Sequence, residues 1–188
     1  MGMTLEEALF DAEDSMEKAV GFMLHEFATI RTGKASPALV ESIDVEAYGS
    51  SMKLKQLALI TAPEPRLLVI QPFDASTTRD IERGINESKL GIAPAVDGKI
   101  IRIPIPELSE ERRKDLAKRV RTLAEEARVR VRACRREAIE AARKLQKEGE
   151  LTEDALRDAE AEAQKLTDKF VASIDAHVAS KEAELMKI

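Results

Sequence analysis

The side chains best suited to binding a ligand form a row in the second half of the chain. Its members, spaced alternately four and three residues apart, are Lys114, Lys118, Arg121, Glu125, Arg128, Arg132 and Arg135. On a helix, this spacing keeps the row on one side. Arg128, Arg132 and Arg135 have no acidic residue three or four positions further along, so like charges are predicted to crowd within one turn. A phosphate polyanion would relieve this crowding, because the guanidinium group is well shaped to bind phosphate.

The charge balance of the chain favours the same interpretation. Residues 110–147 contain 14 Lys and Arg against 7 Asp and Glu, a net charge of +7, whereas the rest of the chain carries −12. A charge run is more often a solvated helix face, and this alternative stays open. With no Trp, one Tyr and five Phe, the chain offers few aromatic rings on which unstacked bases could lie. The row is therefore predicted to follow the phosphates of folded RNA, with a strong salt dependence.

Groups that could support catalysis or bind a metal are few. His25 and His177 are the only histidines, and each is predicted to lie alone in a helix seam, without the companions that a metal site needs. Cys134 is either a small packed apolar side chain or a reactive thiol beside basic neighbours, and neither interpretation indicates an enzyme. The segment GKAS at 33–36 lacks the preceding glycine and the strand of a phosphate-binding loop. We predict no catalytic residue and no metal site.

Three amphipathic helices are predicted to position the row. The first covers residues 3–30 and begins with a capping pair, Thr4 and Glu7. The second covers about 108–148 and carries the row, with Cys134 and Ala141 on its apolar face; the third begins at Thr152 and reaches about residue 186. The middle helix alone would measure roughly 60 Å. The three apolar faces can be buried only on one another, which predicts an elongated three-helix bundle.

A smaller domain of mixed secondary structure interrupts this bundle. Residues 40–105 contain four segments with strand-like character, at about 43–47, 57–61, 67–70 and 99–103. A short helix lies between the last two, with Ser76 as its predicted cap and Gly91 as its stop. Residues 31–37 lead into the domain and residues 104–106 lead out of it. The whole chain is thus predicted to be α+β.

The composition is that of an ordinary soluble protein. No apolar run approaches the roughly 20 residues of a membrane span, and the first residues do not resemble a targeting signal. A single cysteine fits a reducing compartment. We therefore expect a cytoplasmic protein that has no membrane partner.

Several short motifs, taken in order, resemble those of one bacterial family. They are RTGKASP at 31–37, EERRKDL at 110–116, ARVRVR at 127–132, the Arg135-Arg136 pair, QKLTD at 164–168 and KEAELM at 181–186. Their order and spacing are similar to those of bacterial ribosome recycling factor, and the resemblance covers essentially the whole chain. Ala133 and Cys134 depart from the family pattern, which has Asn and an aliphatic residue there.

The resemblance implies an L-shaped protein with two domains. Residues 1–31 and 107–188 would form the three-helix bundle, and residues 32–106 a small β/α/β sandwich. We expect the connectors to act as hinges through Arg31, Thr32, Gly33, Pro104 and Pro106, because they carry few side chains that could pack across them. The bundle would then hold its position while the small domain changes its angle.

The same resemblance implies a role in translation. The protein would bind the post-termination 70S ribosome and, with elongation factor G, separate its subunits and release mRNA and tRNA. GTP would be used by elongation factor G, so no cofactor is expected in this chain. By motif position, Arg113, Arg132 and Arg135 match the family's contacts to large-subunit ribosomal RNA. The row alone adds Lys114, Lys118, Arg121 and Arg128.

A protein scaffold is the alternative from another class. A coiled-coil adaptor could use the same basic helix face to meet an acidic partner. Such an adaptor would associate with itself through its seam, whereas a closed three-helix bundle is expected to be a monomer. The scaffold interpretation does not explain the inserted domain. A third alternative, an enzyme, would require that this domain be active by itself.

Overall fold

The computed structural model describes residues 2–187, which form two compact units. Residues up to Phe27 and from Lys114 onward make the first unit, and Ala28–Arg113 make the second. Each unit has a hydrophobic core of its own. Among the helices of residues 2–187, none combines the length and the apolar character of a membrane span.

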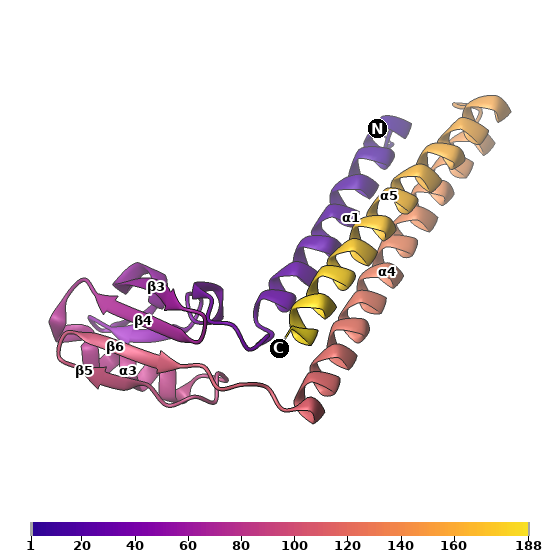
Figure 1. The fold of residues 1–188 in the computed structure, drawn as a ribbon. Coiled ribbons are helices and arrows are strands. Elements are labelled where there is room, and N and C mark those ends of the chain that lie inside the picture. The colour runs from indigo at the N-terminus through magenta and orange to yellow at the C-terminus, as the bar shows by residue number, and fades with distance from the viewer. Residues whose placement is uncertain (1, 188) are drawn as a thin grey trace. The chain divides into compact units, whose positions relative to one another are not determined.

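The first unit is a bundle of three long helices that lie side by side (Figure 1). They are α1 (Leu5–Ala28), α4 (Glu110–Lys147) and α5 (Glu153–Met186). The three predicted helices are confirmed, with their ends moved by two residues at most. Thr4 and Glu7 cap α1 as predicted, since the Thr4 N–H donates to Glu7 at 2.8 Å and the Glu7 N–H donates to Thr4 at 3.2 Å. Thr152 caps α5 by accepting from the Ala155 N–H.

Small side chains allow the three helices to approach closely within the bundle. Ala12 of α1, Ala138 of α4 and Ala163 of α5 form one buried cluster, in which each helix contributes a single methyl group. Larger side chains fill the rest of the core, and those with almost no exposed surface are Met16 and Met23 of α1, Val120 and Val131 of α4, and Ile174 and Leu185 of α5. The bundle core is therefore made by residues of all three helices, as the sequence pattern predicts.

Two positions of the predicted apolar face of α4 differ in the structure. Ala142 is buried where Ala141 is predicted, and Cys134 is only half buried. Both alanines fit a helical repeat of 3.6 residues, so the pattern alone does not choose between them. The position of α4 relative to its neighbours makes that choice.

The second unit contains two antiparallel sheets. A hairpin pairs β1 (Asp44–Ala47) with β2 (Ser50–Lys53), and a four-stranded sheet has the order β3-β4-β6-β5. The strands of this sheet are β3 (Ala58–Glu64), β4 (Leu67–Pro72), β5 (Ala95–Asp97) and β6 (Ile100–Pro104). The helix α3 (Thr78–Glu87) supplies Ile81 and Ile85 to a core that both sheets share. This unit and the bundle together confirm the α+β class.

Sequence patterns miss the smallest elements of the second unit and misplace one cap. β2 and β5 lack apolar alternation because nearly all of their side chains are exposed, and α2 (Leu54–Leu57) is a single turn. Short 3₁₀ turns occupy Pro37–Leu39 and Ala75–Thr77. Ser76 is not a cap: its N–H donates to Asp74 at 2.9 Å, so Asp74 caps the turn before α3. α3 also ends earlier than predicted, at Glu87 and not beside Gly91.

Replacing a helical glycine with alanine is expected to have opposite effects on stability at two positions. A Cβ on Gly84 of α3 would lie 2.9 Å from Val45 Cγ2 and 3.2 Å from the Asp44 carbonyl oxygen, whereas a Cβ on Gly21 of α1 would meet nothing within 4 Å. Gly84→Ala should therefore destabilise the second unit by about 1–3 kcal/mol. Gly21→Ala should stabilise the bundle by up to about 1 kcal/mol, because alanine is the better helix former. Urea unfolding of both variants measures these changes, and a change in the free energy of unfolding with the same sign in both would contradict the prediction.

Candidate nucleic-acid interface

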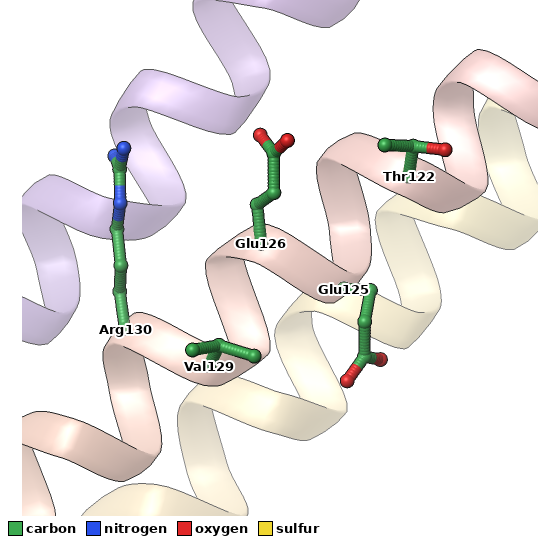
Figure 2. Close-up of a pocket in the computed structure, with 5 residues that line it drawn as sticks. All are labelled: Thr122, Glu125, Glu126, Val129 and Arg130. Atoms are coloured by element: carbon green, nitrogen blue, oxygen red, sulfur yellow. The ribbon is translucent and has the colours of Figure 1, made fainter.

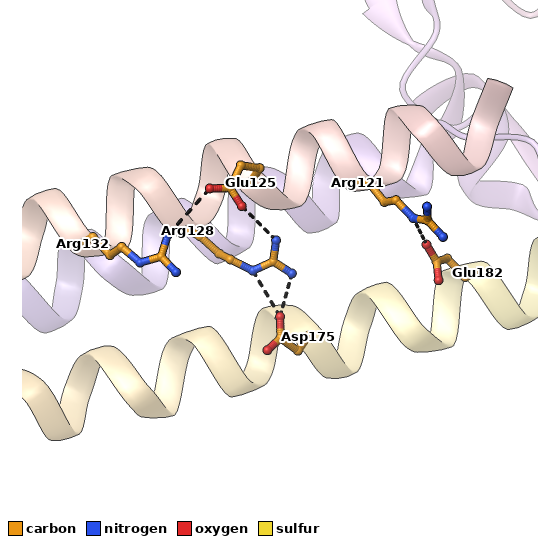
Figure 3. A network of polar contacts seen from close by, with 6 residues as sticks. All are labelled: Arg121, Glu125, Arg128, Arg132, Asp175 and Glu182. Carbon is orange, nitrogen blue, oxygen red and sulfur yellow. Dashed lines mark hydrogen bonds and ion pairs between the residues drawn. The ribbon is translucent and has the colours of Figure 1, made fainter. Parts of the chain in front are cut away.

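The predicted row of cations lies on α4, and every second member of it from Arg121 onward bonds to α5. Arg121 donates to Glu182 at 2.8 Å, Arg128 to Asp175 at 2.6 and 3.1 Å, and Arg135 to Gln164 at 2.6 Å. Figure 3 shows the first two of these contacts. Further along, Arg143 donates to Glu160 at 3.2 Å. One side of the row therefore belongs to the α4–α5 contact.

Arg128 is neutralised within the bundle. Its guanidinium donates to Asp175 and, at 3.2 Å, to Glu125, and only 22% of its side chain is exposed. The hydrogen bond to Asp175 raises the pKa of Arg128, so it is charged at any physiological pH. The predicted crowding of unpaired charge is wrong at this residue. A search three and four positions further along the chain could not find either partner, because Glu125 precedes Arg128 and Asp175 lies on another helix.

Arg135 differs from the other arginines that bond to α5. Its partner, Gln164, is a neutral amide, which in turn donates to Asp168 at 2.8 Å. Arg135 thus keeps its net charge while its orientation is fixed, and its Nε is buried without a hydrogen-bond partner in residues 2–187. Sequence reasoning missed Gln164 as a positioning residue, although it begins the QKLTD motif.

The other side of the row is more open. Arg132 lies 3.6 Å from Glu125, and 49% of its side chain is exposed. Lys118 and Arg136 are exposed, and within residues 2–187 neither side chain has a hydrogen bond or an ion pair. Together with Arg135, these residues are cations of α4 whose charged groups remain available to a phosphate.

The first two predicted RNA contacts lie where the two units divide. Arg113 is half buried on the first turn of α4, at the end of the second unit, and its Nε has no partner in the described chain. Lys114 is exposed at the beginning of the α4 segment of the bundle. Arg113 and Lys114 therefore place one half-buried and one exposed cation near the start of α4, before the other cations of the row.

The predicted hinge residues all lie in the second unit, and some are fixed within it. Pro104 is the last residue of β6 and pairs with Leu67 of β4, so it belongs to the sheet. Gly33 has a φ of +81° and lies against the buried Leu108. Arg31 and Thr32 are half buried and Pro106 is exposed, outside any helix or strand. Of the five predicted hinge residues, only Arg31, Thr32 and Pro106 therefore lack such a contact within residues 2–187.

A shallow depression lies on the outer face of α4 beside the row (Figure 2). It is lined by Thr122, Glu125, Glu126, Val129 and Arg130. Figure 2 shows Glu126 and Arg130 pointing to one side of α4 and Glu125 to another. Arg130 stacks over the Phe22 ring of α1, with its guanidinium carbon 5.0 Å from the ring centre. Arg130 is therefore tied to α1 and lies outside the row.

The histidines and the cysteine form no site in the described chain. Residues 2–187 contain no group of three His, Cys, Asp or Glu side chains placed to hold a metal ion. His177 is half buried, but His25 is exposed, so the predicted seam position is wrong for His25, which turns to solvent from its helix. Burial, with the charge of Glu137, raises the pKa of the Cys134 thiol. A raised pKa keeps the thiol protonated and disfavours a reactive thiolate.

Comparison with known proteins agrees with this architecture. The family model described as ribosome recycling factor matches residues 23–186. The ribosome-recycling factor of Akkermansia muciniphila is 58% identical over 188 residues, covering 99% of this chain and all of the relative. That of Rubrobacter xylanophilus is 54% identical over 180 residues, covering 96% and 97%.

Solved structures give the same result. A solution structure of ribosome recycling factor has a TM-score of 0.83 and 42% identity, with full coverage of both chains. A T. thermophilus ribosome recycling factor, described with E. coli elongation factor G on the E. coli post-termination complex, has a TM-score of 0.70 and 45% identity, covering 98% of this chain and all of that one.

The fold and the basic helix define a class of protein: a three-helix bundle with an inserted α+β unit and a partly unneutralised row of cations on its central helix. Sequence and structure agree on the family within that class. The chain belongs to the ribosome recycling factor family.

Proposed function

We propose that the protein binds the post-termination 70S ribosome and, with elongation factor G and GTP, separates its subunits and releases mRNA and tRNA. Membership of the ribosome recycling factor family supports this function, as does the relative described with elongation factor G on a post-termination complex. GTP is used by elongation factor G, so the chain holds no cofactor and catalyses no reaction. It acts as a monomer in the cytoplasm, where the ribosomes are.

The observation that carries the proposal is the uneven neutralisation of the row. A cation that serves only the α4–α5 contact is expected to meet a carboxylate of α5, as Arg121 and Arg128 do. Instead, Arg135 is held by a neutral amide, Arg132 is half exposed, and Lys118 is unpaired in the described chain. We assign these residues, with Arg113 and Lys114, to phosphates of large-subunit ribosomal RNA. Arg121 and Arg128 are assigned to the α4–α5 contact.

The second part of the proposal concerns the connectors. We assign the hinge to Arg31 and Thr32 on one side and to Pro106 on the other, with Gly33 and Pro104 fixed in the second unit. The small unit would change its angle while the bundle stays on RNA. Dyes placed on the two units should report more than one distance during recycling, and a single unchanged distance would contradict the hinge.

Co-sedimentation with ribosomes tests the function directly. Binding to 70S ribosomes and to large subunits should be saturable and should weaken steeply as salt rises. Loss of the 70S peak should need this protein, elongation factor G and GTP together. Binding whose affinity does not change with salt, or a 70S peak that persists with all components present, would contradict the proposal.

A further inference from the structure

Glu125 is the one acidic member of the row, and its two carboxylate oxygens are divided between two arginines (Figure 3). Oε2 accepts from Arg128 Nη1 at 3.2 Å, and Oε1 lies 3.6 Å from Arg132 Nη1. The same carboxylate thus faces an arginine that is assigned to the bundle and one that is assigned to RNA.

The Arg128 side of this arrangement is fixed. Two Arg128 nitrogens donate to one oxygen of Asp175, at 2.6 and 3.1 Å, and the side chain is mostly buried. Leaving this position would break three hydrogen bonds, so Arg128 stays where it is. Because Arg128 is fixed, it holds the Glu125 carboxylate beside Arg132.

The contact between Arg132 and Glu125 is long and exposed to solvent. The 3.6 Å separation exceeds the usual length of a hydrogen bond, and the two side chains are 49% and 59% exposed. Solvent screens such a pair, so it is weak. A phosphate can accept two charge-assisted hydrogen bonds of about 2.8 Å from one guanidinium, which is a stronger contact. Phosphate should therefore displace Glu125 from Arg132.

We propose that Glu125 is a weak internal counterion of Arg132 in the free protein, that an RNA phosphate displaces it from Arg132, and that it then repels that phosphate. The inference rests on the proposed function and adds a residue that limits affinity. Displacement of the carboxylate and its repulsion of the phosphate both weaken binding. Glu125 thereby hastens departure of the protein from RNA, which a factor that acts in repeated rounds requires.

Glu126 provides a matched control for the test. It is the next residue on α4, and Figure 2 shows it on another side of the helix from Glu125. No hydrogen bond or ion pair joins its side chain to an arginine of the row within residues 2–187. Glu125→Gln and Glu126→Gln change the net charge equally, so long-range electrostatics affects both, and only Glu125→Gln frees Arg132.

The experiment measures affinity and dissociation rate of the full chain on large ribosomal subunits at several salt concentrations. Glu125→Gln should tighten binding roughly two- to fivefold, mainly through slower dissociation, and by more than Glu126→Gln does. In an Arg132→Ala background, the two glutamine variants should become equal. Thermal unfolding of each variant checks that the Arg128–Asp175 contact keeps the bundle intact.

Each other outcome has a definite meaning. Equal effects of Glu125→Gln and Glu126→Gln in the unaltered background, or weaker binding by Glu125→Gln, would overturn the inference and leave the proposed function standing. An excess effect that persists without Arg132 would also overturn it. Failure of the unaltered protein to bind ribosomes would overturn the proposed function itself, and the inference with it.

Discussion

Replacing Arg132 and Arg135 together with alanine should weaken binding to large ribosomal subunits by roughly 100-fold at moderate salt. Arg132 is half exposed, and Arg135 keeps its charge because Gln164 is neutral. A hydrogen bond to a charged group contributes about 1.5–3 kcal/mol, so loss of two such contacts gives at least this change. The plot of log affinity against log salt should also become shallower by roughly two charges. Filter binding over a salt series measures both quantities.

The control removes two cations from the last turn of the same helix. Lys144→Ala with Lys147→Ala changes the net charge by the same amount outside the row. Its binding and its salt slope should stay much closer to those of the unaltered protein. If the Arg132 and Arg135 variant kept the original slope, both residues would be excluded from the phosphate interface.

Replacing Ile174 with alanine should lower the free energy of unfolding of the bundle by about 2–5 kcal/mol. Ile174 has no exposed surface and lies on α5, where it packs into the core of the bundle. Truncation removes buried methyl groups and leaves a cavity that three long helices cannot easily close. Chemical unfolding followed by circular dichroism measures the change, because most of the helical signal comes from this unit.

Ile174→Val is the graded control, and it should lower the same free energy by only about 0.5–1.5 kcal/mol. Hydrogen exchange adds a second check. Amides of α1, α4 and α5 should lose protection in the alanine variant, whereas those of β4 and β6 should keep it, since the second unit has its own core. A loss below about 0.5 kcal/mol for the alanine variant would contradict the packing described for Ile174.

Helix periodicity predicted most of the fold because long amphipathic helices repeat their pattern many times. The three helix ranges and the Thr4 and Thr152 caps are confirmed. β2 and β5 could not be found in the same way, because an exposed edge strand has no buried face to impose alternation. The predicted cap at Ser76 was wrong because a short 3₁₀ turn precedes α3, and Asp74, which is also a good capping residue, caps that turn.

The candidate site was predictable only in part, for a different reason. The row on α4 follows from spacing along one helix, but the partners of its members come from α5. Asp175 lies 47 residues from Arg128, and Gln164 lies 29 residues from Arg135. No local pattern shows which arginine meets a carboxylate and which meets an amide. The division of the row into bundle contacts and available cations is therefore a tertiary property.

The contacts between α4 and α5 also specify how the two helices align. Arg121, Arg128 and Arg143 are separated by 7 and 15 residues, and their partners Glu182, Asp175 and Glu160 are separated by the same intervals in the opposite direction. All three pairs encode one antiparallel alignment, and sliding the helices by a turn would break every pair at once. This redundancy lets any single pair be lost while the alignment is still defined. The alignment of α4 and α5 therefore does not need a carboxylate opposite Arg135, and the charge of Arg135 stays available to an external ligand.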